Sequence, residues 1–522
     1  MRTLKKYYLP VLLSIGIMTS CTKEIIIPMD DIPMEDGYSV LGKKLENPYT
    51  LKVMQQAWDN IQSNNLSNGR TSSNKITLTP THYYVKFKPK NEEELELLLN
   101  SDSTVYFYTY PLDYELTEGM KHFQDPEVPK GQPTYRYAAV KIDYQFPAVQ
   151  YKILEEAFIP EDIPLTNSAR NYVTNSDITI ALTNEAMRIT NNLDYITESQ
   201  PNNIIAPIDD GGGSGGSGGG STGCSYCPQG TMQVWDDNLG ALVPLVGLEV
   251  KARVFLNTKT ALTDATGKYI IWHDFSGTPQ YSFEWQRYNF TIRDNALDAA
   301  ETIGPKTDGW WSANFIGGIS EFHGTIFRAA HHYYYQNING LRRPPLNGFW
   351  NTQLKIRAYN EANTDINGSH CAACRFLGLG SAIKMYNPQR DTRDIYATVI
   401  HELAHASHWS MDQNNYNNGD DIVVESWARG VQWELTRMTY AGYRPPYWRA
   451  ATNGLPFSNY TGVVEDMRDG LLDYDQVQGY TARQIEDALI GQRTFTNWRI
   501  NLTNKYNNGT ETNLVALFDY WN

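Results

Sequence analysis

The sequence from Ile395 to Trp409 reads IYATVIHELAHASHW and predicts a helix that Asp391 can cap. At helical spacing, His401 and His405 lie on one face, one turn apart, where two imidazoles can bind the same metal ion. Glu402 lies beside them and can reach a water molecule on that ion. An ordinary helix can carry two such histidines by chance, so a metal site needs a third ligand elsewhere in the chain.

A third ligand is predicted at Glu425, which follows His405 after nineteen intervening residues. Catalytic zinc sites use three protein ligands and an open fourth position, and two histidines with one glutamate are a common set. The alternative is a solvated glutamate on a helix surface. The HExxH pattern upstream favours the ligand, so we expect His401, His405 and Glu425 to hold Zn²⁺.

The residues between and after these ligands predict a loop and a second helix. Ser410–Asp421 is rich in Asn, Asp and Gly, which favour turns. The second helix is expected to begin at Asp420 or Asp421 and to end near Tyr440. An apolar stripe is expected to face the core and to leave Glu425 on another face. The stripe consists of Val424, Trp427, Val431, Leu435 and Met438.

HELAH, followed by ESWA at Glu425–Ala428, resembles the gluzincin zinc metallopeptidases, the thermolysin-like group in particular. The resemblance covers roughly Glu321–Gly430 and implies a helix and two strands ahead of the zinc helix. These elements would lie in Ala330–Asn337, Leu354–Arg357 and Ile383–Tyr386. The metzincin pattern does not fit, because it needs a glycine at 408 and a third ligand at 411, where this chain has His408 and Met411.

The resemblance implies an endopeptidase in which Glu402 is the general base, with two departures from the thermolysin pattern. Four residues after Glu425 that pattern has an aspartate that orients a zinc histidine, and this chain has Arg429. The thermolysin-like group also uses a downstream histidine as transition-state donor, and no histidine follows His408 here. A tyrosine or an arginine is expected to replace it. The candidates are Tyr440, Tyr443, Tyr447, Tyr480 and Arg429.

Four cysteines form two CxxC pairs, Cys224 with Cys227 and Cys371 with Cys374. Outside the cytoplasm disulfides are favoured, either within each pair or between the pairs, and a structural Cys₄ zinc site is the alternative. His370, beside Cys371, could be an alternative ligand there, although a surface histidine is the simpler expectation.

Two more roles are expected near the metal helix. His408 is expected to make a structural hydrogen bond, because a fourth protein ligand would close a catalytic site. By resemblance, Arg375–Leu377 would be the edge strand that pairs with the substrate backbone.

Residues 1–21 are predicted to be a lipoprotein signal peptide, followed by a tether over residues 22–73. Basic residues precede an apolar run, Tyr7–Met18, that is too short to span a bilayer. Met18–Cys21 resembles a bacterial lipoprotein processing site. This resemblance implies that Cys21 is lipidated and holds the protein outside the cytoplasm, with the outer membrane as the expected location. An ordinary secretory signal is the alternative.

The remaining length suits about three domains, because single cores rarely exceed about 250 residues. Residues 74–205 are expected to form a small α/β domain that serves as a spacer or binding module, with a pro-segment as the alternative. Strands are expected in Ile76–Lys88, Val105–Tyr110 and Tyr137–Phe146. Helices are expected in Glu92–Leu99, with Asn91 and Glu94 as a capping box, and in Tyr151–Phe158.

A Gly/Ser linker over residues 206–223 contains Gly211–Gly223, which predicts a flexible coil that uncouples the first domain from the rest. In residues 224–297, the segments Pro244–Val250 and Leu262–Ile270 are similar to the carboxypeptidase regulatory-like domain, a small β-sandwich. Asp264 and Gly267 would shape a turn there. This resemblance implies an accessory role without catalysis.

Residues 298–522 are expected to form the zinc peptidase domain, with a mostly helical C-terminal part. Helices are expected in Thr481–Ile490, capped by Thr481 with Gln484, and in Asn497–Trp521. The fold class expected for the whole chain is therefore multidomain α+β.

The net charge of −14 and pI of about 5.2 give no reason to expect nucleic acid or an anionic membrane as a partner. Membrane contact is expected through the N-terminal lipid only, and the oligomeric state stays open. The leading hypothesis is a tethered zinc endopeptidase that acts on peptides or proteins. The alternative is a non-catalytic surface lipoprotein that binds peptide or glycan, and an aminopeptidase is a weaker third option.

Overall fold

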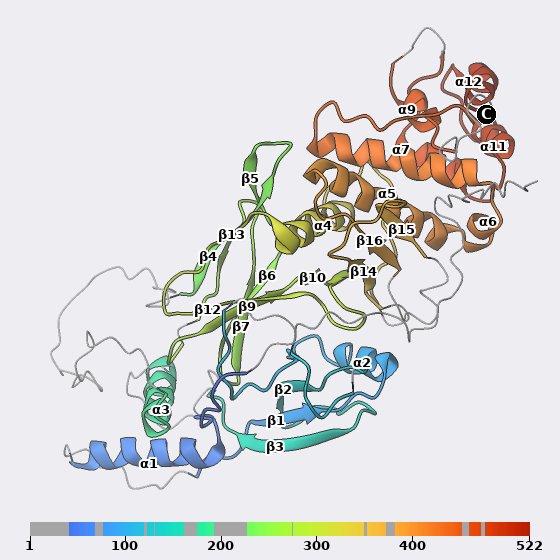
Figure 1. Cartoon of the computed structure of the whole chain (residues 1–522). Coiled ribbons are helices and arrows are strands. Elements are labelled where there is room, and N and C mark those ends of the chain that lie inside the picture. The colour runs from blue at the N-terminus through green and yellow to red at the C-terminus, as the bar shows by residue number, and fades with distance from the viewer. Residues whose placement is uncertain are drawn as a thin grey trace, which may run out of the picture.

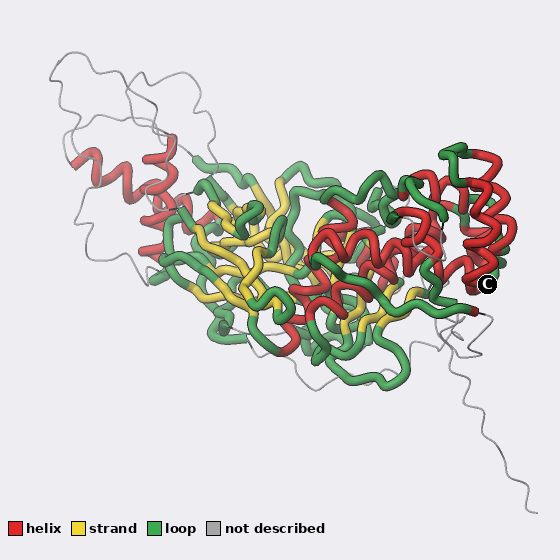
Figure 2. The backbone as a smooth tube through the Cα atoms, turned by 90° about the horizontal axis from the view of Figure 1, so that it is seen from above, coloured by secondary structure: helices red, strands yellow, loops and turns green. Residues whose placement is uncertain are grey.

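The structure is a computed structural model in which both helices and several sheets form an α+β architecture (Figures 1 and 2). It describes residues 41–67, 77–118, 123–129, 131–160, 175–192, 227–273, 275–348, 352–371, 382–450, 459–470 and 476–522. Within these ranges no helix has the length and apolar character that a bilayer crossing requires. The predicted signal peptide with Cys21 and the run Gly211–Gly223 lie outside the described residues.

The N-terminal region combines a small antiparallel sheet with three helices. The sheet has the order β2-β1-β3, with strands β1 (His82–Phe87), β2 (Arg136–Lys141) and β3 (Tyr151–Ala157). The helices are α1 (Leu51–Ser67), α2 (Glu92–Leu99) and α3 (Asn175–Ile189). Helix α1 lies in the range expected to be a tether. It nevertheless packs against α3. Residues 41–67 belong to the folded part of the chain.

Helix α2 is confirmed, with half of its predicted capping box. The side chain of Asn91 accepts a hydrogen bond from Glu94 N, but Glu94 Oε2 accepts from Lys90 N in place of the Asn91 backbone. The predicted helix at Tyr151–Phe158 is wrong. This segment is the edge strand β3, because pairing of its backbone with β1 outweighs the local helix preference of its Leu-Glu-Glu run.

The predicted strand at Val105–Tyr110 is also wrong. It makes one isolated bridge, Tyr108 with Tyr137, and its tyrosines turn toward the following region. The hydroxyls of Tyr106 and Tyr108 lie 3.0 and 2.9 Å from the hydroxyls of Thr260 and Thr258. The strands expected in Ile76–Lys88 and Tyr137–Phe146 exist in shorter form as β1 and β2.

Two sheets pack together in the central part of the chain. One has the order β12-β9-β6-β7, and the other has the order β13-β4-β5 with β8 paired to β4. The rings of Phe283 on β9 and Phe315 on β13 lie 5.7 Å apart between the two sheets. The strands are β4 (Gln229–Asp236), β5 (Ala241–Pro244), β6 (Glu249–Val254), β7 (Asn257–Leu262), β8 (Lys268–Ile270), β9 (Gln280–Glu284), β12 (Glu301–Lys306) and β13 (Ala313–Phe315).

The predicted turn before β8 is confirmed. Asp264 Oδ1 accepts hydrogen bonds from the backbone N–H groups of Thr266 and Lys268. Gly267 adopts φ +79°, and a Cβ there would meet the backbone oxygen of Met232 at 2.6 Å. The close approach of β4 therefore requires glycine at this position.

A five-stranded mixed sheet packs against helix α5 (Thr392–Met411) and has the order β10-β11-β14-β16-β15. Its strands are β10 (Gln286–Arg287), β11 (Phe290–Arg293), β14 (Leu354–Ala358), β15 (Gly368–His370) and β16 (Ile383–Met385). Helix α4 (Gly318–Tyr335) and the strands β14 and β16 confirm the helix, strand and strand expected ahead of the metal helix. Strand β15 forms the edge, whereas Arg375–Leu377 lies outside the described residues.

The expected boundary between residues 297 and 298 is wrong, because strands on its two sides interleave. Strand β11, from the expected sandwich segment, lies parallel to β14 in the five-stranded sheet. Strands β12 and β13, from the expected peptidase segment, pair with β9 and β4. One continuous core therefore extends from Met232 to Trp521.

The C-terminal part is helical, as expected. Its helices are α5 (Thr392–Met411), α6 (Gln413–Asn417), α7 (Asp421–Thr439), α9 (Val463–Arg468), α10 (Ala482–Leu489), α11 (Phe495–Lys505) and α12 (Leu514–Trp521). The capping box of α10 is confirmed. The single helix expected at Asn497–Trp521 is instead two helices, separated by a turn in which Gly509 has φ +87°. The predicted loop Ser410–Asp421 contains the short helix α6.

The prediction that the Gly/Ser linker uncouples the N-terminal region is wrong. One hydrophobic cluster joins residues of the N-terminal region, among them Tyr49, Tyr110 and Met187, to Val254 at the end of β6 and to Phe255 in the following turn. The linker sequence indicates only a flexible covalent connection between the two parts. It carries no information about the surfaces that meet in the fold.

Candidate metal centre

Helix α5 begins where side chains from two segments satisfy its first N–H groups. Asp391 is its N-cap, as predicted, and Asp391 Oδ1 accepts from Asp394 N at 2.9 Å. Asp237 Oδ1 accepts from Thr392 N at 2.9 Å, and Asn238 Oδ1 accepts from Arg393 N at 2.7 Å. The turn between β4 and β5 thus anchors the N-terminal end of α5.

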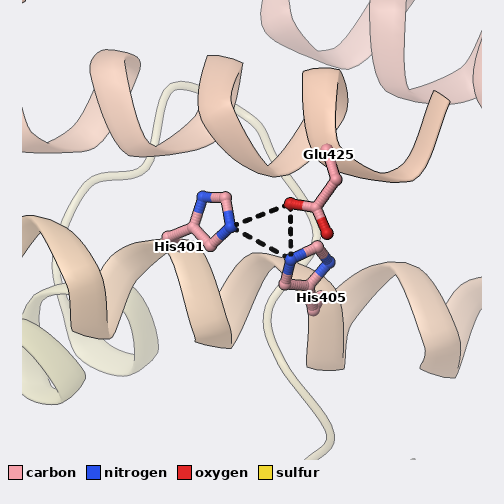
Figure 3. A group of neighbouring side chains, drawn as sticks. All are labelled: His401, His405 and Glu425. Carbon is pink, nitrogen blue, oxygen red and sulfur yellow. Dashed lines mark hydrogen bonds and ion pairs between the residues drawn. The ribbon is translucent and has the colours of Figure 1, made fainter. Parts of the chain in front are cut away.

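Helix α7 lies beside α5 and presents Glu425 to it (Figures 1 and 3). Its predicted bounds are confirmed, with Asp420 and Tyr440 as the flanking residues. The predicted stripe is partly wrong, because Val424 is only half-buried and Met438 is 42% exposed. Val423 is buried in place of Val424, so the helix is rotated and Glu425 itself faces inward.

The three predicted ligands come together in the structure (Figure 3). His401 Nε2 and His405 Nε2 are 3.1 Å apart. Glu425 Oε2 lies 3.2 Å from His401 Nε2 and 3.4 Å from His405 Nε2. All three side chains are buried. Among the described residues they are the only such group of His, Cys, Asp or Glu side chains.

This donor set fits a metal ion. Three lone-pair atoms meet in a buried space, and at most one proton can lie between two imidazole nitrogens at hydrogen-bond distance. Two histidines and one carboxylate are a common protein set for catalytic zinc. The three residues therefore supply what a zinc ion requires from the protein and leave further coordination positions to water or substrate.

Burial and mutual attraction shift the protonation of these groups. Burial lowers the pKa of His401 to about 4, although its hydrogen bond to Glu425 opposes this effect. The Glu425 carboxyl is also penalised by burial, but attraction to His405 and His401 prevails and holds its pKa well below its usual range. Glu425 is therefore an ionised carboxylate, ready to bind a cation.

Glu402 is buried next to this group, at 2% exposure. Burial raises its pKa to about 8, against the opposing effect of His405. Strand β15 packs directly against this side chain, since a Cβ on Gly368 would lie 3.0 Å from Glu402 Cγ and 2.7 Å from Thr398 Cγ2. Sequence reasoning missed Gly368, because only the fold shows which strand meets the helix.

Arg429 and Tyr460 form a cation–π pair near the candidate ligands. The Arg429 guanidinium lies 4.0 Å from the centre of the Tyr460 ring, and the Tyr460 ring lies 5.7 Å from the His401 ring. The charge of Arg429 also contributes to lowering the pKa of His401. His401 Nδ1 is buried and has no hydrogen-bond partner within the described residues. A cation thus lies near the imidazole of His401.

Aromatic side chains surround the other histidine. His370 is half-buried on the edge strand β15, and its ring stacks 6.2 Å from the ring of His405. Its Nδ1 lies 3.3 Å from the Tyr416 hydroxyl, and the Tyr416 ring contacts His408 at 5.1 Å. His408 is not a member of the ligand group. Burial lowers its pKa to about 3.

The contacts of the predicted transition-state tyrosines lie mainly with other parts of the fold. Tyr440 donates to Asp236 Oδ2 at 2.7 Å, and Tyr443 accepts from Gln432 Nε2 at 2.9 Å. The Tyr447 ring packs on Trp521 at 6.0 Å, and the backbone N–H of Tyr480 bonds to Met467 O. Of the predicted candidates, Arg429 is the one whose charge affects the ligands, and Tyr460 is a residue that sequence reasoning missed.

Cys227 and Cys371 each take part in a disulfide bond. Cys224 and Cys374 lie outside the described residues. The chain matches no known protein family and no characterised protein at a significant level. The case for a function therefore depends on the geometry of the metal centre.

Proposed function

We propose that this protein is a zinc-dependent peptidase. The observation that carries the proposal is the convergence of His401 Nε2, His405 Nε2 and Glu425 Oε2 within 3.4 Å of one another, with Glu402 buried beside them. Zinc-dependent hydrolysis of a peptide bond uses ligands and a base of these kinds. No second function is supported by an observation of similar weight.

Each residue has a defined chemical role in this proposal. A zinc ion held by the three ligands would supply a Lewis acid that acidifies water and polarises a carbonyl group. Glu402 accepts the proton of the attacking water and delivers it to the leaving amine, a role that its buried position beside the ligands allows. Tyr460 and Arg429 are the nearby groups that can donate to a developing oxyanion.

The proposal for the domains, the membrane anchor and the substrate class is based on the sequence motifs. The five-stranded sheet and the C-terminal helices would form a gluzincin-type peptidase domain, and the two packed sheets would form a regulatory-like β-sandwich. Cys21 would carry a lipid that tethers the protein outside the cytoplasm, at the outer membrane. The substrate class would be peptides or proteins, cleaved internally, with β15 as the edge strand available to the substrate backbone.

Metal content of the purified chain tests the site first. Elemental mass spectrometry without added zinc should find about one zinc at the histidine and glutamate ligands. The zinc should be lost on His401→Ala or Glu425→Ala. His408→Gln is the matched control on the same helix, because His408 is not a ligand, and it should retain the metal. A chain that holds no zinc, even after zinc is offered, contradicts the proposal.

Hydrolysis of a casein-type substrate tests the reaction. Activity should disappear with a chelator and return with zinc, and Glu402→Gln should lower the rate by at least about 100-fold while zinc stays bound. Activity that survives both the chelator and Glu402→Gln would show that another mechanism operates. A zinc-loaded chain without activity that still binds peptide or glycan would favour the surface-binding lipoprotein.

A further inference from the structure

The five-stranded sheet has two chemically different faces. Phe290 and Ile292 on β11, with Leu354 and Ile356 on β14, are fully buried in the core that contains α4 and α5. Because side chains alternate along a strand, Arg293 and Lys355 on the same two strands point to the opposite face. That face would be cationic if nothing covered it.

Helix α2 of the N-terminal region covers the cationic face. Glu92 and Glu96 lie one turn apart on α2 and both reach the two cations. Arg293 Nη1 lies 2.9 Å from Glu92 Oε1, and Arg293 Nη2 lies 3.2 Å from Glu96 Oε1. Lys355 Nζ lies 3.1 Å from Glu92 Oε1 and 2.8 Å from Glu96 Oε1. Two positive and two negative charges therefore balance inside the contact.

These charges are withdrawn from water. The side chains of Lys355 and Arg293 are 1% and 3% exposed, and those of Glu92 and Glu96 are 8% and 11% exposed. Burial would raise the pKa of Glu92, but the charges of Lys355 and Arg293 prevail and lower it below its usual value. In such a buried network, loss of one partner leaves an unpaired charge and is strongly unfavourable.

A second set of contacts joins the N-terminal region to the central sheets. Arg253 Nη1 donates to Leu112 O at 2.9 Å, and the Tyr110 hydroxyl donates to Glu301 Oε1 at 3.2 Å. Buried Arg136 on β2 also forms an ion pair with Asp298. The contact thus combines hydrogen bonds, ion pairs and the hydrophobic cluster that includes Val254 and Phe255.

The described residues of the N-terminal region lie away from the metal centre. Figure 1 shows α2 and the small sheet on the side of the five-stranded sheet away from α5 and α7. Helix α2 contacts β11 and β14, whereas the strand that packs against Glu402 is β15, at the sheet edge. An inhibitory segment would have to reach the opposite face.

We propose that the N-terminal region, residues 41–192, is a permanently bound part of the protein and does not inhibit the proposed peptidase activity. It stays bound through the contacts of α2 and Arg253 when the covalent linker is cut. The partner surface is the cationic face of the five-stranded sheet, and the recognition is charge pairing inside a buried contact. Binding is independent of the proposed peptidase activity, and only the absence of inhibition depends on it.

A cut in the linker tests the binding. A site-specific protease sequence replaces part of Gly211–Gly223 in the full chain, and the cut protein is analysed by size-exclusion chromatography with light scattering. Both fragments should elute together at the mass of the uncut chain. Separate elution of the two fragments would overturn the proposal.

Matched variants identify the contact. Glu92→Gln with Glu96→Gln should weaken fragment association by at least about 100-fold, because two buried cations lose their partners. Glu93→Gln, on the exposed face of α2, should leave association unchanged. Glu96→Gln alone replaces the double variant if that variant fails to fold. Equal association in all variants would show that the charge network does not hold the fragments together.

The hydrolysis rate tests the lack of inhibition. Cutting the linker should change the rate on a casein-type substrate by less than about twofold. A rise of tenfold or more after the cut would show an inhibitory pro-segment and would overturn this part of the proposal. If neither sample hydrolyses the substrate, the proposed function fails. Co-elution of the fragments would still support the proposal that the N-terminal region stays bound.

Discussion

Arg429 puts a fixed positive charge one helical turn after the ligand Glu425. Metal-binding histidines commonly donate their second ring nitrogen to a carboxylate or carbonyl, which raises their basicity. His401 Nδ1 has no such partner among the described residues, and the nearby guanidinium stacks on Tyr460. A cation cannot accept a hydrogen bond from His401. Arg429 is therefore expected to weaken the binding of zinc by His401.

Replacement of Arg429 by aspartate should therefore tighten zinc binding. The change replaces a positive charge near His401 by a negative one, and carboxylates close to metal-binding histidines change metal affinity by about 10–100-fold. Zinc affinity is measured by competition with a chromophoric chelator. Arg499→Asp on α11 carries the same charge change away from the ligands and should leave affinity unchanged. Weaker zinc binding in Arg429→Asp would contradict the assigned role.

Gly368 is a residue whose importance comes from one close contact. A methyl group there would approach Thr398 Cγ2 to 2.7 Å and Glu402 to 3.0 Å. Gly368→Ala should lower stability by about 1–3 kcal/mol, as overpacked sites do, and should displace Glu402 and slow hydrolysis. Thermal unfolding and the hydrolysis rate measure the two effects. Gly348→Ala is the matched control, because its Cβ would meet no atom within 4 Å. Unchanged values in Gly368→Ala would contradict the contact.

At the level of elements, the metal centre depends on how α5 starts and on what holds it. Its first turn is satisfied by Asp391 from its own segment and by Asp237 and Asn238 from the turn between β4 and β5. A buried network continues this link, since Asp236 Oδ2 accepts from both Arg328 on α4 and Tyr440 after α7. The central sheets are therefore part of the support of α5 and α7.

Loss of the N-cap should be measurable. Asp391→Ala removes the acceptor for Asp394 N and should lower the free energy of unfolding by about 1 kcal/mol. Asp391→Asn keeps an acceptor and should change the free energy of unfolding by only a few tenths of ~1 kcal/mol. Urea unfolding followed by circular dichroism compares the two variants. Equal stability in both would show that the caps from Asp237 and Asn238 suffice.

At the level of the whole molecule, the contact between α2 and the sheet should respond to acid. The pKa of Glu92 is lowered in the assembled protein, so its ion pairs stabilise the contact above the ordinary glutamate pKa of about 4.5. This stabilisation should be lost as the pH falls from about 4.5 through the lower pKa of the bound state. Association of the fragments after the linker cut, measured against pH, should therefore weaken on acidification.

Glu92→Gln supplies the comparison for this pH dependence. The variant has no carboxylate to protonate at position 92, so its fragment association should start weaker and vary less between pH 5 and pH 3. Glu93→Gln should keep the wild-type dependence, because that side chain is exposed. A wild-type profile that stays flat down to pH 3 would show that Glu92 contributes little to the contact.

Much of the metal centre could be predicted from local patterns. The helix bounds, the N-cap and the two histidines follow from spacing within one helix, because 3.6-residue periodicity alone places i and i+4 on one face. Glu425 followed from the chemistry of zinc, which needs a third ligand. Met438 and Val424 were misplaced in the stripe, since the rotation of α7 depends on the neighbours α5 and α9.

Long-range contacts could not be predicted in this way. The strand at Tyr151–Ala157, the pairing of β11 with β14 and the approach of Gly368 to Glu402 depend on residues far apart in the chain. The sequence by itself determined the identity and order of the candidate metal-binding side chains, because they lie within two helices with regular periodicity. Only the tertiary structure decided the partners of the sheet faces and the place of the N-terminal region. Burial and charge pairing between distant segments leave no periodic signal in the sequence.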